Sequence, residues 1–269
     1  SDVRPTSEIS DKIDNLDEIK KTIEKIKSET LIKAKNLFSP HAIIKSVEEG
    51  LNLSFPNAID NERRLFKECI ESPQRQGLIH SFFAERAITK VPELELGKPK
   101  ELKKIGVIGG GTMGTGISMA AMNAGFSVVM IEQNDEAIEK ALTKINATYD
   151  RNVKLGRISS EQKNKIMSLF TAVTNMDNLN DRDLVIEAVF ENMEIKKQVF
   201  AKLNIICSKE CILASNTSYL DVNEIASVVE NPSRVIGLHF FSPANIMKLL
   251  EIVVANKTSD DTVATAFLL

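Results

Sequence analysis

The sequence is poor in cysteine. It contains three, Cys69, Cys207 and Cys211, among 269 residues. Three cysteines are too few for a disulfide framework, and the Cys207/Cys211 pair has no neighbouring histidine to complete a zinc site. We therefore predict no metal centre, and we expect buried free thiols in a reducing compartment.

Long apolar runs and an excess of one charge are also missing. No run approaches the roughly 18 apolar residues of a membrane span, and the polar, acidic start is unlike a secretory signal. The net charge is −3; residues 1–100 carry 17 basic and 17 acidic side chains, which leaves 17 of 34 basic and 20 of 37 acidic for the rest. Without a basic footprint, nucleic-acid binding is not expected. These features indicate a soluble intracellular protein without a membrane span.

The first hundred residues follow a helical pattern. Apolar residues at helix-like spacing predict an amphipathic helix over 11–37 and shorter helices over 39–47, 57–71 and 74–88. From Thr89 to Leu102 the periodicity fades and prolines and a glycine appear, which is typical of a linker. We place a domain boundary here and predict a helical segment over 1–102, followed by a second domain over 103–269.

After the linker, short apolar runs alternate with helical patterns. The runs at 105–108, 127–131, 184–188, 211–214, 235–238 and 249–253 read as buried strands. Such alternation is typical of parallel strands joined by crossover helices. We predict an α/β fold: a Rossmann-type, doubly wound, mostly parallel sheet preceded by a helical linker segment.

The first of these strands leads into a glycine motif. Gly109 suits a tight turn, Gly111 lets the backbone approach a pyrophosphate, and Gly114 lets the following helix pack closely. Glu132 ends the second strand 23 residues after Gly109 (132 − 109), near the roughly 20 expected for an acid that binds a ribose diol. This carboxylate would repel a 2′-phosphate, and the next two residues carry no positive charge. The motif therefore predicts a dinucleotide site that prefers NAD to NADP.

Polar residues follow two later strands. Glu191 follows the run 183–189, and Lys196 lies on the next helix; they are either cofactor contacts or ordinary surface charges. Ser, Asn, Thr and Ser occupy 215–218, where they could cradle a polarised substrate oxygen or cap the helix that starts near Asp221.

A single histidine stands at the end of another strand. His239 precedes a turn that can bring Glu251 back alongside it. A carboxylate would fix the imidazole tautomer, so that the other ring nitrogen could take a proton from an alcohol. The alternative is a satisfied core histidine.

Together these motifs resemble the L-3-hydroxyacyl-CoA dehydrogenases of fatty-acid β-oxidation. The resemblance covers 103–269 in order and rests on the glycine motif ending at Glu132, the stretch 187–192 with Lys196, the stretch 215–218, residues 239–243, and Leu250 with Glu251. Position 242 is Ser in this chain. In this it resembles the multifunctional branch of the family, whereas the single-function enzymes look to have Asn at this position.

The resemblance implies a role for each matched residue. His239 would be the general base, Glu251 its partner, and Ser218 a contact of the substrate oxygen. Glu191 and Lys196 would lie by the nicotinamide and its ribose, and Glu132 by the adenosine ribose. The implied NAD contacts are Gly109, Gly111, Thr112, Met113, Gly114, Glu132, Glu191, Lys196 and Asn216.

The helical half extends the resemblance. Residues 40–92 are similar to the segment that joins hydratase and dehydrogenase parts in the multifunctional enzymes, which suggests a piece of such a chain. The implied partners are an acyl-CoA substrate, the hydratase domain and a C-terminal helical domain; the hydratase's own catalytic part has no counterpart here, so no lyase activity is assigned. The expected location is the peroxisome for a eukaryotic source or the cytoplasm for a bacterium. The alternatives are a non-catalytic NAD-binding and interdomain fragment, or a related dehydrogenase of 3-hydroxy acids.

Overall fold

A computed structural model describes residues 7, 15–88 and 90–269. The chain divides into two compact units, Ser1–Lys90 and Val91–Leu269. Among the described residues, no helix is both long and apolar enough to cross a membrane.

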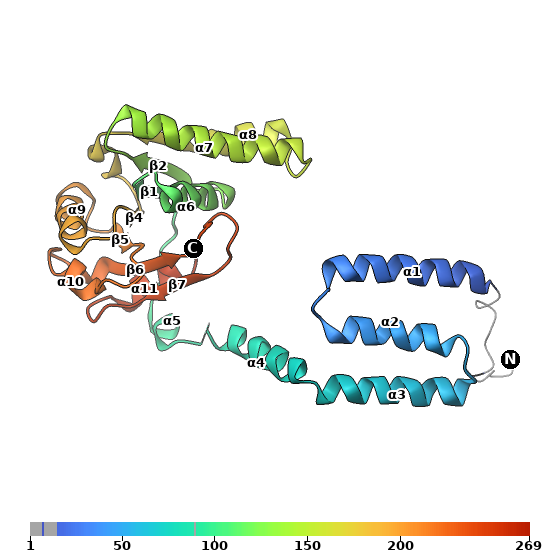
Figure 1. The fold of residues 1–269 in the computed structure, drawn as a ribbon. Coiled ribbons are helices and arrows are strands. Elements are labelled where there is room, and N and C mark those ends of the chain that lie inside the picture. Colours follow the sequence, from blue (N-terminus) through green and yellow to red (C-terminus); the bar gives the residue numbers. More distant parts are fainter. Residues whose placement is uncertain (1–6, 8–14, 89) are drawn as a thin grey trace, which may run out of the picture. The chain divides into compact units, whose positions relative to one another are not determined.

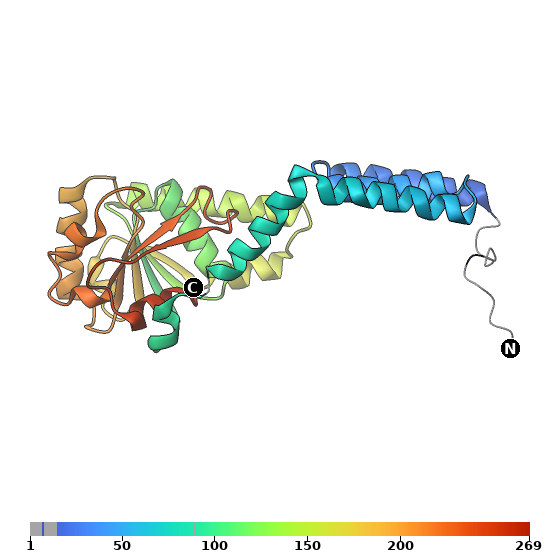
Figure 2. The ribbon, with the colours of Figure 1, turned by 90° about the horizontal axis from the view of Figure 1, so that it is seen from below.

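The first unit is helical, as the sequence predicts. α1 (Leu16–Lys33), α2 (Phe38–Gly50) and α3 (Phe55–Glu71) lie side by side, and α4 (Pro73–Ala87) follows (Figures 1 and 2). Pro73 begins α4 at a position where a missing N–H costs nothing, and the Ser72 hydroxyl accepts a hydrogen bond from the Arg75 amide at 3.2 Å. Residues 11–14 of the first predicted helix lie outside the described part.

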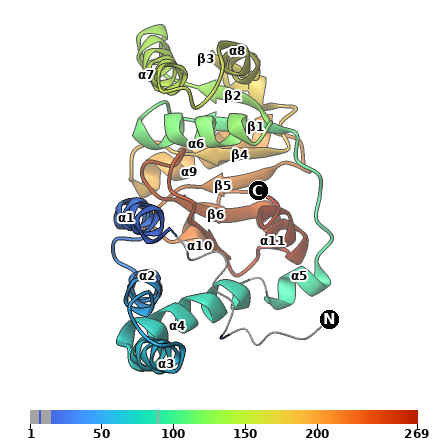
Figure 3. The same cartoon turned by 90° about the vertical axis from the view of Figure 1, so that its right-hand side faces the viewer.

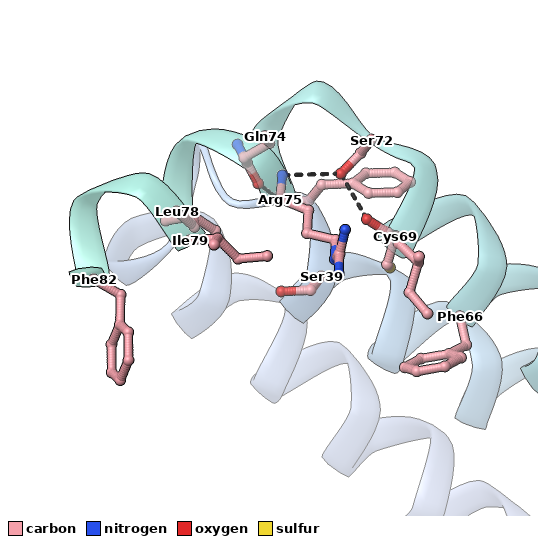
Figure 4. Close-up of a pocket in the computed structure, with 11 residues that line it drawn as sticks. Ser39, Phe66, Cys69, Ser72, Gln74, Arg75, Leu78, Ile79 and Phe82 are labelled. Carbon is pink, nitrogen blue, oxygen red and sulfur yellow. Dashed lines mark hydrogen bonds between the residues drawn. The ribbon is translucent and has the colours of Figure 1, made fainter. Parts of the chain in front are cut away.

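This helical unit carries an open apolar groove. Its volume is about 520 Å³, and it lies among α2, α3 and α4 (Figure 4). Three phenylalanines, Phe38, Phe66 and Phe82, are among the residues that line it, and Phe66 is 63% exposed. The buried apolar side chains of α1 to α4 are Ile23, Ala42 and Leu65, so the core of this unit is small.

The second unit is a doubly wound α/β domain (Figure 3), which confirms the predicted fold class. Its strands are β1 (Lys104–Ile108), β2 (Ser127–Ile131), β3 (Phe170–Val173), β4 (Leu184–Glu187), β5 (Ile212–Ser215), β6 (Val235–Phe240) and β7 (Leu250–Val253). The order is β3-β2-β1-β4-β5-β6-β7, in which only the β6/β7 pairing is antiparallel. Strand order reverses between β1 and β4, and ligands of such sheets bind at that point.

Helices cover both faces of the sheet. The helices of this unit are α5 (Pro92–Leu96), α6 (Thr112–Asn123), α7 (Asp135–Lys154), α8 (Ser160–Met167), α9 (Met193–Ile206), α10 (Val222–Ala226) and α11 (Asp260–Ala266), with 3₁₀ turns at Met176–Leu179 and Pro232–Arg234. Alternate strand residues enter different cores: Leu184 and Ile186 join α6 and α7 on one face, and Val185 joins α9 on the other.

Two features differ from the sequence predictions. Strand β3 was not expected, because its four residues lie at the sheet edge and are at most half-buried, so they show no strong apolar run. Helix α5 lies inside the predicted linker, where Pro92 takes the first helical position. The segment after it is bound to α11: the Lys98 amide donates to Asp261 at 2.7 Å and the Lys100 amide to the Thr265 hydroxyl at 3.0 Å. The compact unit begins at Val91, inside the stretch Thr89–Leu102 where the sequence predicts the linker.

Candidate active site

The turn between β1 and α6 has the shape that the glycine motif predicts. Gly109 has φ +97°, in the left-handed region that glycine adopts easily. A Cβ at Gly114 would lie 1.7 Å from the Gly109 carbonyl oxygen, so the helix approaches the turn more closely than any side chain would permit. A Cβ at Gly111 would meet nothing within 4 Å. Open space therefore lies in front of the α6 N-terminus, where a helix favours an anion.

Thr112 and Met113 form the first turn of α6, as a pyrophosphate site requires. Lys144, from α7, donates to the Thr112 hydroxyl at 3.3 Å, which adds positive charge at the same place. The backbone and charge at this end of the helix thus fit the two phosphates of a dinucleotide.

Glu132 lies at the end of β2, beside the turn. One carboxylate oxygen accepts a hydrogen bond from the Gly110 amide and the other from the Gln133 amide at 2.9 Å. The side chain is half-buried. Glu132 therefore stabilises the glycine turn. It also occupies the position from which an acid can reach a ribose.

A buried charged network joins the ends of β4 and β5. Lys196, only 1% exposed, lies 2.7 Å from Glu187 and 3.1 Å from Glu191. Glu187 is fully buried and also accepts hydrogen bonds from the Val189 amide at 2.8 Å and the Ser215 hydroxyl at 2.7 Å. The interpretation of Lys196 as an ordinary surface charge is thus wrong. Its side chain is buried, and a buried ammonium needs opposite charges such as the two carboxylates that it contacts here.

Glu191 is the more exposed acid of this network. It accepts hydrogen bonds from the Thr217 hydroxyl at 2.5 Å and the Ser218 amide at 2.9 Å. Burial acts to raise the pKa of its carboxyl, but the hydrogen bonds of Thr217 and Ser218 and the ion pair with Lys196 outweigh burial. The pKa lies below its ordinary value, so Glu191 is ionised at neutral pH.

The stretch 215–218 does not cap a helix. Asp221 caps α10 itself. The Asn216 side-chain oxygen accepts the Phe240 amide at 2.9 Å, which connects the end of β5 to that of β6. Ser218 stays exposed, and its hydroxyl lies 3.4 Å from Glu191. The helix-cap alternative is therefore wrong, and Ser218 stays available to a ligand.

His239 and Glu251 face each other across the antiparallel pair β6/β7. They occupy opposed positions in the strand register, and His239 Nδ1 lies 2.8 Å from Glu251 Oε2. Because an ionised carboxylate only accepts, the neutral ring carries its proton on Nδ1. The lone pair is then on Nε2, the arrangement that a general base needs.

The structure thus joins the predicted residues in three groups: the glycine turn with Glu132, Glu191 with Lys196 and Ser218, and His239 with Glu251. Sequence reasoning missed Glu187 as a site residue. A signal was present, because an acid at the end of the apolar run Leu184–Glu187 must have a buried partner. No group of three or more His, Cys, Asp or Glu within the described residues could hold a metal ion. All three cysteines are free; Cys207 and Cys211 are buried and Cys69 is intermediate.

Comparison with known families identifies the second unit of the chain. Residues 104–269 match the profile described as "3-hydroxyacyl-CoA dehydrogenase, NAD binding domain". The chain belongs to this family. Its second unit is therefore an NAD-binding domain, which confirms the predicted cofactor and the resemblance.

Relatives in this family include longer, multifunctional proteins. The chain is 38% identical over 252 residues to the peroxisomal fatty acid beta-oxidation multifunctional protein AIM1 of Arabidopsis thaliana, covering 93% of this chain and 35% of that protein. It is 37% identical to the peroxisomal bifunctional enzyme of Danio rerio, covering 87% and 32%. The chain thus spans about a third of the length of these curated relatives.

Solved structures agree. The 3-hydroxybutyryl-CoA dehydrogenase of Escherichia coli K12 has a TM-score of 0.60 at 37% identity, over 61% of this chain and 35% of that one. The dehydrogenase part of multifunctional enzyme 1 from C. elegans has a TM-score of 0.59 at 34% identity, over 64% and 39%.

Proposed function

We propose that this chain is part of an enzyme that oxidises the 3-hydroxyl group of an L-3-hydroxyacyl-CoA to the 3-keto group in fatty-acid β-oxidation. The observation that carries the proposal is the His239–Glu251 pair, at 2.8 Å, in a domain of the 3-hydroxyacyl-CoA dehydrogenase family. A paired histidine suits an alcohol oxidation, because the hydroxyl proton must leave as the C3 hydrogen departs with its electrons.

His239 is the general base. Its Nε2 takes the hydroxyl proton. Glu251, which contacts Nδ1, stabilises the imidazolium that results. Ser218, exposed after β5, would donate to the substrate oxygen. Bound NAD supplies the hydride acceptor. The α6 N-terminus would hold its pyrophosphate and Glu132 its adenosine ribose.

A turnover assay with L-3-hydroxybutyryl-CoA and NAD tests these roles. We expect His239→Gln to lower kcat by about a thousandfold and Glu251→Gln by a smaller factor, since the base survives but loses its orienting partner. Calorimetric NAD affinity should stay unchanged in both, because neither residue touches the pyrophosphate or ribose. Full turnover in His239→Gln would contradict the role of His239.

A second candidate follows from the length comparison. Because the curated relatives are about three times as long, this chain could serve as an NAD-binding and interdomain module that needs other parts of such a protein for catalysis. NAD binding without turnover in this chain, and turnover in a chain of the relatives' full length, would favour this candidate. Equal turnover in both would exclude it.

The partners and location are further parts of the proposal. We propose covalent partners in the same polypeptide, a hydratase part and a C-terminal dehydrogenase part, with residues 1–102 as the linking helical segment. Relatives named as a multifunctional protein and a bifunctional enzyme, each about three times as long, support a longer polypeptide with more than one part. Their names also support the peroxisome if the source is eukaryotic. Co-localisation of the tagged protein with a peroxisomal marker, in cells of its source, tests that assignment.

A further inference from the structure

The buried network Glu187–Lys196–Glu191 holds two acids and one base. Each partner of Glu187 is a donor: the Val189 amide, the Lys196 ammonium and the Ser215 hydroxyl. An ionised carboxylate, which only accepts, satisfies all three donors. Glu191 is ionised because its lowered pKa follows from its own donors. The network, called the acid–lysine triad below, therefore carries a net charge of −1.

The triad lies beside the crevice of the sheet. Glu187 ends β4, and the Gly109 turn of β1 approaches it so closely that a Cβ at Gly109 would lie 2.8 Å from the Ala188 carbonyl oxygen. A dinucleotide crosses such a crevice where the strand order reverses. With the adenosine at Glu132 and the pyrophosphate at α6, the nicotinamide end falls over the ends of β4 and β5. Glu191, whose side chain is 27% exposed, is the most exposed member of the triad and so the one that a nicotinamide here would meet.

A negative charge here acts differently on the two forms of the cofactor. The nicotinamide ring of NAD⁺ carries a positive charge and that of NADH is neutral, whereas the remaining parts of the two molecules are the same. Because Glu187 and Lys196 are buried and Glu191 is only partly exposed, the field of the triad is screened less by water and salt than that of a surface carboxylate.

We propose that the acid–lysine triad makes the site discriminate between the two cofactor forms, favouring NAD⁺ over NADH by its net negative charge. Glu187 is then a specificity-determining residue that acts through Lys196 and Glu191 without touching the cofactor. The inference rests on the proposed function only in placing the nicotinamide over β4 and β5. It also fits an enzyme that works in the oxidative direction.

The test is the ratio of the two dissociation constants, Kd(NADH)/Kd(NAD⁺), measured by calorimetric titration of the full chain. Glu187→Gln keeps the shape of the side chain and removes one unit of negative charge. We expect the ratio to fall roughly fivefold to tenfold, mainly through weaker NAD⁺ binding, as for one unit charge in a partly solvated site. A purely structural role would weaken both forms equally and leave the ratio unchanged.

Three further variants separate charge from shape. Glu191→Gln removes the same charge from the more exposed acid and should shift the ratio in the same direction, even if Glu187→Gln fails to fold. Ser215→Ala removes one hydrogen bond to Glu187 at constant charge, and Glu132→Gln changes the distant adenosine end; neither should move the ratio. An unchanged ratio in both acid variants overturns the proposal. Failure of the proposed function would show instead as full turnover in His239→Gln, which this titration does not involve.

Discussion

Gly111 and Gly114 lie in the same turn for different physical reasons, and substitution can distinguish them. A Cβ at Gly114 would lie 1.7 Å from a backbone oxygen, whereas a Cβ at Gly111 would meet nothing within 4 Å. We expect Gly114→Ala to lower the free energy of unfolding by about 4 kcal/mol, because backbone and helix must both shift. Gly111→Ala should unfold like the parent protein but bind NAD at least tenfold more weakly, since its methyl group occupies the pyrophosphate space.

Urea unfolding and NAD titration of both variants check this pair. Unchanged NAD affinity in a folded Gly111→Ala would mean that the pyrophosphate does not approach this residue. Equal unfolding free energies in Gly114→Ala and the parent would mean that α6 can move away from the turn at little cost.

Glu191 should make stability depend on pH at the acidic end. Its pKa is lowered in the folded chain from an ordinary value of 4.5, so the folded state binds fewer protons there than the unfolded state. Its contribution is present above about pH 4.5 and is lost as the pH falls through the lowered pKa. The difference in Tm between the parent and Glu191→Gln should therefore be largest above pH 5 and shrink towards pH 3. A difference that stays constant from pH 7 to pH 3 would contradict this assignment.

The placement of a residue could be predicted from the sequence where its side chain had one physical reason to be there; the roles in binding and catalysis stay predictions. The glycines and Glu132 follow from turn geometry and spacing, and His239 with Glu251 from a turn that reverses the chain. Glu187 was missed because an apolar run hides a single acid, and its partner Lys196 lies nine residues later on a different element. Only the packing of α9 on the sheet brings the two together.

At the scale of elements, the contact between the proposed base His239 and Glu251 depends on the pairing of β6 with β7. Gly237 lies two positions before His239 and opposes Val253, and a Cβ there would lie 2.7 Å from the Val253 Cβ. Gly237→Ala should push β7 outward and separate His239 from Glu251. We expect kcat to fall about tenfold with little change in NAD affinity, because the glycine turn lies on other strands.

A matched double variant sharpens this test. Gly237→Ala with Val253→Gly transfers the glycine across the strand pair and removes the contact, so it should restore most of the lost kcat. Val253→Gly alone controls for the added flexibility of a glycine in a strand. If the double variant is no faster than Gly237→Ala, the loss does not come from the spacing of β6 and β7.

Element prediction failed for two short elements, β3 and α5, for a physical reason. The central strands are buried on both faces, so their apolar runs are unmistakable. The edge strand β3 (Phe170–Val173) is short and partly exposed, and it is recognised only by its pairing with β2. Helix α5 holds five residues after a proline, too few for any helical periodicity.

For the whole molecule, the two units differ in how much core they contain. The sheet unit has apolar clusters on both faces, while the helical unit buries few side chains and leaves the groove of about 520 Å³ open. All the residues that we propose to bind NAD, from Gly109 onward, lie in the sheet unit. We therefore expect a chain of residues 91–269 to fold and to bind NAD within about twofold of the full-length affinity.

A second prediction concerns the residue at which the NAD-binding domain begins. The sequence places the boundary after residue 102, but residues 92–100 are bound to α11 by α5 and by hydrogen bonds from the Lys98 and Lys100 amides to α11 side chains. Each such bond stabilises the fold by about 1 kcal/mol, and removing them also exposes α11. A chain of residues 103–269 should therefore melt several degrees below one of residues 91–269. Calorimetry of the two chains decides the matter: equal Tm values would put the boundary where the sequence does, and a lower Tm for the shorter chain would make 91–102 part of the NAD-binding domain.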